Sequence, residues 1–542
     1  MWTEALTEAC IRDTGKPPIP VRWVTTNKGD KLHPNVRCRL VAKHLVAKYG
    51  GKELSEDLFA AMPPFELVKA LLVKAVQRRD RKTKVRKLLF IDVSKAHLYA
   101  PVTDGVKNYV ALPPECCKPG VCGLLNFWLY GMRPASNGWQ EEYTRQLTEM
   151  GFKPGEASPC CFYNKESDVS CVVHGDDFTF EGPPGALDEV TKSLRKVWLI
   201  KVRALLGPDP TDDKEVSILN RIIRWKKDAL LYEADPRHVE KLLKEAGLED
   251  CNALGTPGTK LPTDSAKAWF EGEDAPPGRT DDPTGGHQSP GQEDHANTAA
   301  DGSRYLDRGQ MREYRSAVAR CNYLAADRLE IAFTTKELCR SMANPTEADA
   351  KAVARLCRFL KGVPRIVQRI AFEDYPPTVI EAYVDSDWAG CRKTRKSTSG
   401  GILFFGGAAV RGWSSNQGVI ALSSGEAEYY AALKGASAAL GFQSMLADLG
   451  MRGSITLYTD SSAARGIIHR AGLGKLRHLE TGYLWLQAAV KSKKLQVRKV
   501  LGTENPADLL TKHLSAADMW KNLERLHMSP EAGRSAAVPN IA

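Results

Sequence analysis

A stretch without apolar side chains divides this sequence of 542 residues. Residues 283–303 contain no apolar residue except alanine, and the surrounding segment 261–310 carries ten acidic and four basic residues. Such a segment cannot bury enough apolar surface to offset the conformational entropy lost on ordering. We therefore expect an acidic disordered linker over 256–310, with folded parts of the chain on both sides of it.

The composition is that of an ordinary globular protein. The net charge of +11 suggests an anionic partner, because a basic excess favours binding to polyanions. No stretch approaches the ~18–20 consecutive apolar residues of a membrane span, so no membrane is expected. The 13 cysteines are scattered along the chain, which is typical of reduced thiols in an intracellular protein.

Before the acidic segment, the hydrophobic pattern predicts both helices and strands. Residues 65–79 carry apolar side chains at helical spacing, and residues 87–93 (KLLFIDV) predict a buried strand. Residues 169–180 predict two short strands around a His-Gly-Asp-Asp turn. After the acidic segment, the pattern predicts helix over 311–362, with Gly362 as its C-terminal cap.

The last part of the chain alternates strands and helices. The pattern predicts strands at 379–388, 400–407 and 454–460 and a long helix at 425–450. Acidic residues lie on these elements and at the start of a final helix; they are Asp385, Glu428, Asp460 and Asp508. Each alone has an ordinary interpretation as a turn or cap residue.

Together, the four acids follow the strand–helix–strand–helix order of a ribonuclease H fold. Carboxylates that converge on one sheet repel each other unless cations bind between them. Two Mg²⁺ ions roughly 3.5–4 Å apart in such a cluster activate water and stabilise the leaving oxygen of a phosphodiester. The pattern therefore favours a two-metal phosphodiesterase site.

The run from 383 to 432 resembles the ribonuclease H domain of copia-type LTR retrotransposon polyproteins. It reads YVDSDWAGCRKTRKSTSGGILFFGGAAVRGWSSNQGVIALSSGEAEYYAA, and the family carries YSDADWAG, TRKSTSG, WSSKKQ and ALSSTEAEY-like segments in the same order. LYTDSSAA and NPADLLTK extend the resemblance to about residue 515. By this resemblance, Asp385, Glu428, Asp460 and Asp508 are the metal-binding catalytic set. Asp387 and Glu426 are supporting acids, His478 has a structural or strand-contacting role, and the role of His513 stays open.

The N-terminal part resembles the reverse transcriptase of the same family. FIDVSKAHLYAPV (90–102) is similar to the family's LDVKTAFLNGDL, and VVHGDDFTF (172–180) stands where the family has YVDDIL. The resemblance implies that Asp92, Asp176 and Asp177 hold two Mg²⁺ ions against the triphosphate and the primer 3′-hydroxyl.

WVTTNKGDKLHPNVRCRLVAK (23–43) is similar to the fingers segment of that family. The resemblance implies substrate contacts for four residues, which are Arg37, Arg39, Lys43 and His97. The three basic residues would grip the triphosphate, and the alternative is an exposed basic strand edge. His97 stands where the family has the aromatic residue that blocks a ribonucleotide 2′-hydroxyl, and His174-Gly175 replaces Tyr-Val before the paired aspartates.

The resemblance implies an α/β and α+β multidomain chain, in which a right-hand polymerase precedes a ribonuclease H-like three-layer α/β domain. The expected parts are reverse transcriptase fingers and palm at 16–255, the acidic linker at 256–310, a helical thumb or connection segment at 311–375, the ribonuclease H domain at 376–515 and a C-terminal tail at 516–542.

The implied function is an RNA-directed DNA polymerase with ribonuclease H activity. Such an enzyme adds dNTPs to a primer by two-metal catalysis and cleaves the RNA strand of RNA–DNA hybrids. Its expected partners are an RNA template, a DNA primer, the hybrid and dNTPs, and its cofactor is Mg²⁺, two ions per active site, which Mn²⁺ can replace. A cytoplasmic virus-like particle and the nucleus both fit as its location. The alternative is a catalytically decayed or host-adopted nucleic-acid-binding remnant, against which the seven intact carboxylates argue.

Overall fold

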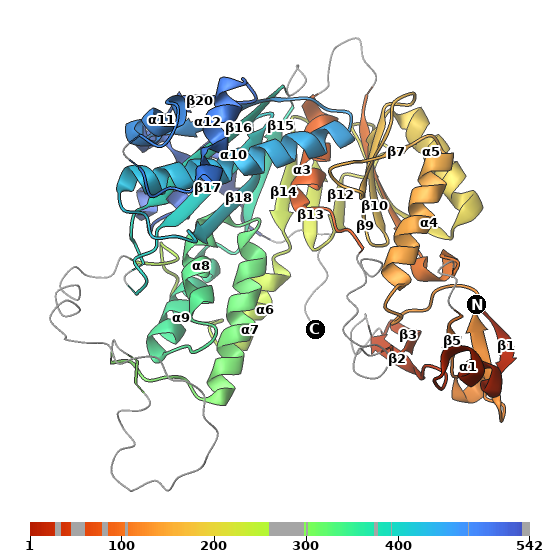
Figure 1. The fold of residues 1–542 in the computed structure, drawn as a ribbon. Helices are drawn as coiled ribbons and strands as arrows, with labels where there is room; N and C mark the ends of the chain where they lie inside the picture. Colours follow the sequence, from red (N-terminus) through yellow and green to blue (C-terminus); the bar gives the residue numbers. More distant parts are fainter. Residues whose placement is uncertain are drawn as a thin grey trace, which may run out of the picture.

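The computed structural model describes residues 1–27, 34–44, 60–77, 85–102, 107–259, 298–299, 302–372, 378–391, 393–474 and 476–533. These residues form a mixed α/β multidomain structure (Figure 1). Most of the expected acidic linker at 256–310 lies outside the described residues. Within them, no helix is both long enough and apolar enough to span a lipid bilayer.

Two small antiparallel sheets form the N-terminal part of the molecule. Their strands are β1 (Trp2–Leu6), β2 (Val21–Asn27), β3 (Val36–Ala42), β5 (Tyr109–Val110) and β6 (Val121–Leu125). One sheet has the order β1-β6-β5 and contacts helix α1 (Thr7–Thr14), and the other is the β2–β3 hairpin. Both lie at the lower right of Figure 1.

A six-stranded antiparallel sheet follows, with the order β11-β4-β10-β9-β8-β7. The strands are β4 (Lys87–Val93), β7 (Lys153–Pro154), β8 (Cys161–Asn164), β9 (Val169–His174), β10 (Asp177–Gly182) and β11 (Ile200–Leu206). The strand predicted at 87–93 and the hairpin predicted at 169–180 are confirmed. Successive residues of β4 point to opposite faces, so that Leu88 and Phe90 join one apolar core and Leu89 and Ile91 the other. Helices α4 (Ala135–Glu149) and α5 (Pro184–Val197) pack into the second core.

A five-stranded antiparallel sheet joins segments that the sequence separates. The strands are β12 (Glu215–Ile218), β13 (Arg221–Trp225), β14 (Ala229–Ala234), β15 (Ile366–Ala371) and β21 (Met528–Pro530), in that order across the sheet. The expected domain limits at 255, 311 and 516 therefore cut through one sheet. Leu230 of β14 pairs with Ile370 of β15 and both are buried, so distant segments share one core, which local sequence patterns do not reveal.

Helices flank this sheet. They are α6 (Arg237–Glu245), α7 (Arg308–Ala325), α8 (Ala332–Arg340), α9 (Glu347–Gly362) and α13 (Ala516–Arg525). The helical character predicted for 311–362 is confirmed, but the assignment of Gly362 as the cap is wrong. Gly362 is the last helical residue, and Val363 is the cap, whose N–H donates to the Phe359 carbonyl. Because Pro364 follows, Val363 is disfavoured in the helical region and the helix ends there.

The C-terminal sheet has the order β18-β17-β16-β19-β20. Its strands are β16 (Val379–Asp387), β17 (Thr398–Phe405), β18 (Ala408–Asn416), β19 (Ser454–Thr459) and β20 (Gln496–Lys499). Strands β16 to β18 are antiparallel neighbours, whereas β19 and β20 run parallel to β16. The accompanying helices are α10 (Ser424–Asp448), α11 (Ser462–His469) and α12 (Trp485–Lys491).

The strands and the long helix predicted for this last part are confirmed to within a few residues, whereas the final helix expected to begin at Asp508 is not. Helix α10 packs closely on the sheet, because a Cβ at Gly435 would lie 2.3 Å from a side-chain atom of Val384. Asp508, expected at the start of a final α-helix, lies instead in the short 3₁₀ helix η8 (Pro506–Leu510). The next α-helix begins at Ala516 and belongs to the segment expected as a tail.

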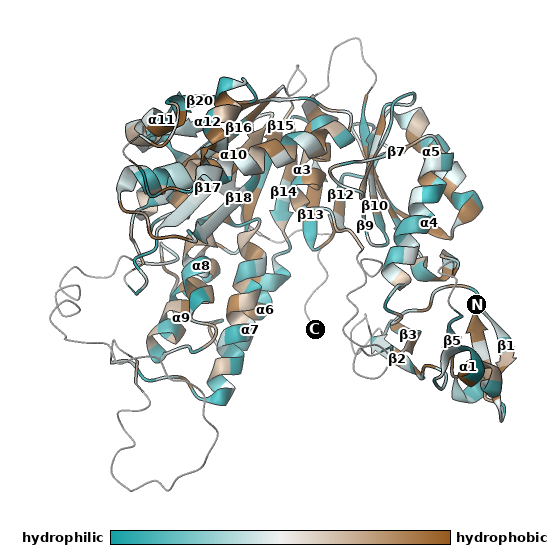
Figure 2. Ribbon diagram, in the orientation of Figure 1, coloured by the Kyte–Doolittle hydropathy of each residue, from teal (hydrophilic) through white to brown (hydrophobic). Residues whose placement is uncertain are grey.

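Helix α3 (Phe65–Gln77) is buried between the sheets. Every residue from 66 to 76 is buried, charged residues included, and the helix contacts β4, β9 and β10, β14 and β15, and β18. Figure 2 shows apolar residues along α3 and the neighbouring strands and hydrophilic residues along the outer helices α6 and α7. The helix predicted from apolar spacing at 65–79 is thus a central element of the core and not a surface helix.

The end of α10 forms a polar junction with the six-stranded sheet. The Asp448 carboxylate accepts hydrogen bonds from the backbone N–H groups of Glu156 (3.0 Å), Ala157 (3.0 Å) and Ser158 (2.8 Å). The Ser170 hydroxyl of β9 donates to the Leu449 carbonyl at 2.9 Å. The α10 junction, defined by these contacts, fixes the C-terminal sheet against the six-stranded sheet.

We predict that Asp448→Ala lowers the free energy of unfolding by about 1–3 kcal/mol, because it leaves three backbone donors without their charged acceptor. Urea unfolding of the whole chain measures the change. Glu156→Ala is the matched control, since it removes an exposed carboxylate of the same junction but keeps the N–H, and it should change stability by less than about 0.5 kcal/mol. Equal losses in the two variants would show that the Asp448 contacts contribute nothing.

Candidate active sites

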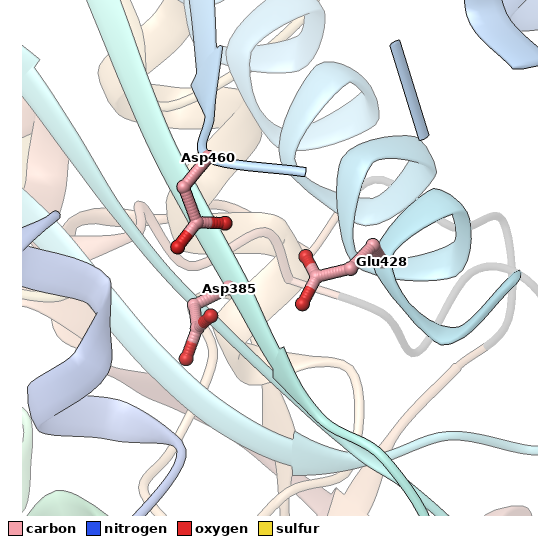
Figure 3. A group of neighbouring side chains, drawn as sticks. All are labelled: Asp385, Glu428 and Asp460. Atoms are coloured by element: carbon pink, nitrogen blue, oxygen red, sulfur yellow. The ribbon is translucent and has the colours of Figure 1, made fainter. Parts of the chain in front are cut away.

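Three acidic residues of the C-terminal sheet meet at one point. Asp385 lies on β16, Glu428 on α10 and Asp460 directly after β19, and their carboxylates point toward one another in Figure 3. One oxygen from each lies within 4.8 Å of the others. Because β16 and β19 are parallel neighbours, their carboxyl ends reach the same edge of the sheet, where α10 crosses them.

Asp508, the fourth predicted acid, is linked to this group by the side chain of Lys512. Lys512 Nζ lies 2.7 Å from Asp508 Oδ1 and 3.9 Å from Asp385 Oδ2. The Thr511 hydroxyl also donates to Asp385. Asp508, Lys512 and His513 line a cavity of about 750 Å³, so the fourth acid and its lysine face an open space next to the three-acid group.

Burial and mutual repulsion raise the pKa values of these acids. Burial, with the nearby Glu428 charge, raises the pKa of Asp385 well above its ordinary value. Burial also raises the pKa of Glu428 to about 7, although the N–H (3.2 Å) and hydroxyl (2.9 Å) of Ser386 donate to its Oε1. The pKa of Asp460 is raised by burial and by the charge of Asp508.

One oxygen of this cluster has no hydrogen-bond donor. Glu428 Oε2 is buried and has no hydrogen-bond partner among the described residues. Buried polar atoms normally have partners, and hard divalent cations bind carboxylate oxygens. The donor set of Asp385, Glu428 and Asp460 therefore fits Mg²⁺ or Mn²⁺.

The neighbouring polar residues support α10 and the loops around it. Glu426 is buried, accepts from the Leu422 N–H at 3.0 Å and lies 3.0 Å from His478 Nε2. Asp387 ends β16 beside Gly390, where an added Cβ would lie 1.5 Å from its carboxylate. His513 Nδ1 lies 3.5 Å from the Thr334 hydroxyl. In this structure Glu426 and His478 contact each other and not the three-acid group.

A second acidic pair lies on the six-stranded sheet. Asp92 of β4 and Asp177 of β10 are direct partners across the ladder. Asp176 precedes Asp177 in the β9–β10 turn and is exposed. Burial raises the pKa of Asp177 to about 6, with the nearby Arg203 charge opposing the rise and Asp176 and Asp92 adding to it.

Arg203 connects the two strand acids and is not among the sequence-predicted site residues. Its Nη2 lies 2.6 Å from Asp92 Oδ1 and 3.1 Å from Asp177 Oδ1. Arg203 belongs to β11, at an irregularity of the pairing with β4. The alternating pattern of IKVRALL indicates the strand, but nothing in it marks an irregularity, so the sequence held no signal for this contact.

Two of the predicted substrate-binding residues lie against the ring of Tyr130. His97, in the 3₁₀ helix η2 (Ala96–Tyr99), packs against the Tyr130 ring with 4.7 Å between ring centroids. The Arg39 guanidinium carbon lies 5.5 Å from the same ring centroid. Burial lowers the pKa of His97, against the attraction of the Asp176 charge. Tyr130 is not among the site residues predicted from the sequence, although it stands in the Leu-Tyr-Gly segment that precedes α4.

The remaining two predicted residues lie at the surface. Arg37 is an exposed residue of β3, and Lys43 follows that strand and is also exposed. Within the described part of the chain, neither residue forms a hydrogen bond or ion pair with Asp92, Asp176 or Asp177. The structure therefore brings Arg39 and His97 together at Tyr130, with Arg39 itself exposed, and leaves Arg37 and Lys43 along the outer strand.

Comparison with known proteins places the chain in a family. A family model described as reverse transcriptase (RNA-dependent DNA polymerase) matches residues 11–260. The retrovirus-related Pol polyprotein from transposon TNT 1-94 of Nicotiana tabacum is 24% identical in an alignment of 530 residues that covers 95% of this chain and 36% of that protein. The Pol polyprotein from transposon RE1 of Arabidopsis thaliana is 26% identical over 92% of this chain and 31% of its own length.

This chain thus spans about a third of the length of those relatives. Among solved structures, the prototype foamy virus protease–reverse transcriptase aligns with 94% of this chain and 73% of its own, at 10% identity and a TM-score of 0.24, a value too low to support an argument about the fold. The alignments with the plant transposon proteins run along nearly the whole chain, and the family model covers the sheet that carries Asp92 and Asp177. Residues 11–260 carry a reverse transcriptase domain, and nearly the whole chain is similar to the copia-type retrotransposon Pol polyproteins.

Proposed function

We propose that this chain is the reverse transcriptase and ribonuclease H portion of such a polyprotein. It extends a DNA primer on an RNA template with dNTPs, and it cleaves RNA in an RNA–DNA hybrid. The observation that carries the nuclease part is the convergence of Asp385, Glu428 and Asp460 within 4.8 Å. The strand order β18-β17-β16-β19-β20 with α10 against the sheet supports a ribonuclease H-like three-layer domain.

In the proposed nuclease site, Asp385, Glu428 and Asp460 would hold two Mg²⁺ ions, or Mn²⁺ in their place. Bound cations there supply an activated water and stabilise the leaving oxygen. Ser386 orients Glu428 through two donated hydrogen bonds. Lys512 holds Asp508 next to Asp385, so that the fourth acid can join the set.

In the proposed polymerase site, Asp92, Asp176 and Asp177 would hold the cations that position the triphosphate and the primer 3′-hydroxyl. Arg39 lies against Tyr130 and would contact the triphosphate, and Arg37 and Lys43 would extend this basic edge. His97 packs on Tyr130 and would face the sugar of the incoming nucleotide. The match of residues 11–260 to the reverse transcriptase (RNA-dependent DNA polymerase) family supports this assignment.

We further propose fingers and palm within 16–255 and the nuclease domain within 376–515. The five-stranded sheet adds β21 and α13 to the connection between them, since β21 pairs with β15. The proposed location is intracellular, either in a cytoplasmic particle or in the nucleus.

One observation favours the alternative of a nucleic-acid-binding remnant without polymerase activity. The Arg203 guanidinium lies between Asp92 and Asp177, where the proposed reaction needs divalent cations. Primer extension by the wild-type chain in Mg²⁺ decides between the two, because a remnant would bind the primed template without extending it.

Exchanging one acid in each site separates the two activities. We predict that Asp460→Asn lowers hybrid cleavage at least about 100-fold, because the amide keeps the shape but removes a charge that the cations need. Primer extension by that variant should stay within about twofold of wild type. Asp92→Asn is the matched control and should lose extension but keep cleavage. Unimpaired cleavage by Asp460→Asn would contradict the assignment of this residue.

Extension also tests the third acid of the polymerase set. We predict that Asp176→Asn loses primer extension without losing template binding, since the same argument about charge applies. Gel-shift titration with the primed template measures binding alongside the extension assay. Retained extension would remove Asp176 from the set.

The raised pKa values predict an unusual pH dependence without metal. Glu428 has a pKa of about 7 in the folded chain, above its unfolded value, so its protonated form favours folding. Its contribution is complete below the unfolded pKa and is lost as the pH rises through about 7. In EDTA, the free energy of unfolding should therefore fall between pH 5 and pH 7.5, by at most about 3 kcal/mol for this group, and Mg²⁺ should restore it.

Glu428→Gln is the control for that measurement, because the amide cannot lose a proton in this range. Its unfolding free energy in EDTA should depend less on pH than that of wild type. An identical pH slope in the two chains would show that Glu428 does not titrate as the structure indicates.

His97 provides a test of sugar selection. An imidazole is smaller than a phenyl ring, so His97→Phe should press more firmly against a 2′-hydroxyl. We predict that it raises the ratio of kcat/KM for deoxynucleotides over ribonucleotides about fivefold. Tyr130→Phe keeps the ring beneath His97 and should leave the ratio nearly unchanged. An unchanged or lower ratio in His97→Phe would show that this residue does not face the sugar.

A further inference from the structure

A β-bulge directs Arg203 toward the acids of the six-stranded sheet. In the pairing of β11 with β4, Val202 lies opposite Ile91 and Ala204 opposite Phe90, so Arg203 is the extra residue of a bulge. A regular register would place Arg203 opposite Phe90, which is fully buried. Ala204 takes that position instead. The bulge therefore keeps a charge out of the core and re-aims the Arg203 side chain, as bulges beside active sites commonly do.

The re-aimed guanidinium binds both strand acids with one nitrogen. Nη2 lies 2.6 Å from Asp92 Oδ1 and 3.1 Å from Asp177 Oδ1. Within the described part of the chain, Arg203 is the only residue with an ion pair to either carboxylate. The arginine thus neutralises the charge repulsion between two acids that face each other across the ladder.

A divalent cation and the arginine compete for these two acids. Mg²⁺ binds carboxylate oxygens at about 2.0–2.1 Å, and a guanidinium charge beside Oδ1 of both acids repels a cation that approaches them. The arginine side chain is 33% exposed, and its flexible stem can carry the charged group into solvent. The contact can therefore open without unfolding the sheet.

We infer that Arg203 is an internal counter-ion of the polymerase acids, which a divalent cation must displace before that site can act. The inference rests on the proposed polymerase function. It implies that the arginine weakens metal binding at Asp92 and Asp177, and that a neutral residue of similar size at position 203 strengthens it.

Mn²⁺ binding to the full chain tests this inference independently of activity. The probe is Mn²⁺ alone, and the electron paramagnetic resonance signal of free Mn²⁺ reports binding. Glu428→Gln serves as the background, because it weakens the proposed nuclease site. Binding that disappears in Asp92→Asn defines the site on the six-stranded sheet.

In that background, we expect Arg203→Gln to tighten the Asp92-dependent site about tenfold, the size expected for losing one close charge pair. Lys201→Gln is the matched control. It removes an exposed positive charge from the same strand, opposite Asp92 in the ladder, and should change the affinity by less than about twofold. Arg203→Lys keeps the charge and should bind Mn²⁺ much more like wild type than Arg203→Gln does.

The outcomes are distinguishable. Equal or weaker Mn²⁺ binding by Arg203→Gln overturns the inference, and so does an equal gain in Lys201→Gln, which would reflect net charge alone. An Asp92-dependent site that appears only in Arg203→Gln supports it. A last outcome is that no Asp92-dependent Mn²⁺ site is found in the Glu428→Gln background, either with Arg203 or with Arg203→Gln. If Arg203→Lys and Arg203→Gln then both keep wild-type stability to urea, the inference and the proposed polymerase site fail together.

Discussion

The burial of helix α3 is the constraint on which the arrangement of the sheets depends. Its charged residues are buried, and each pairs with other parts of the chain. Glu66 pairs with Arg411 of β18 at 2.7 Å and Lys69 with Asp327 at 3.8 Å. Lys74 pairs with Glu181 of β10 at 3.5 Å and donates to the carbonyl of Leu449 at 3.2 Å. A buried charge without a partner costs several kcal/mol. The six-stranded sheet and the C-terminal sheet therefore stabilise each other, and both acidic sites are held on one body.

Local patterns predicted most elements, because each depends on residues close in sequence. The apolar run 87–93 and the spacing in 425–450 are examples, and the motif resemblance named the three acids that converge at β16, α10 and β19. What depends on distant segments could not be predicted. The pairing of β14 with β15 crosses the acidic segment, β21 joins from residues expected as a tail, and the bulge at Arg203 leaves no trace in the alternation of β11.

Both acidic sites bring carboxylates closer together than their charges favour, and they offset this in two ways. At the C-terminal sheet, burial raises the pKa values of Asp385 and Glu428, so protons reduce the negative charge when cations are absent. At the six-stranded sheet, an arginine binds Asp92 and Asp177. In the proposed sites, a cation would displace the protons at one and the guanidinium at the other, so that each site could fold without metal and still accept it.

The lysine at the C-terminal site differs from this arginine in how it is held. Lys512 follows Asp508 by four residues and belongs to the same local turn of chain, so its charge stays near Asp508 whether or not cations bind. Nearby acids raise its pKa against the effect of burial, which keeps it charged. Arg203 comes from a neighbouring strand and reaches the acids only through a bulge. On the proposed functions, Lys512 is a local positive charge that supports one site, and Arg203 is a displaceable one that competes with the cation at the other.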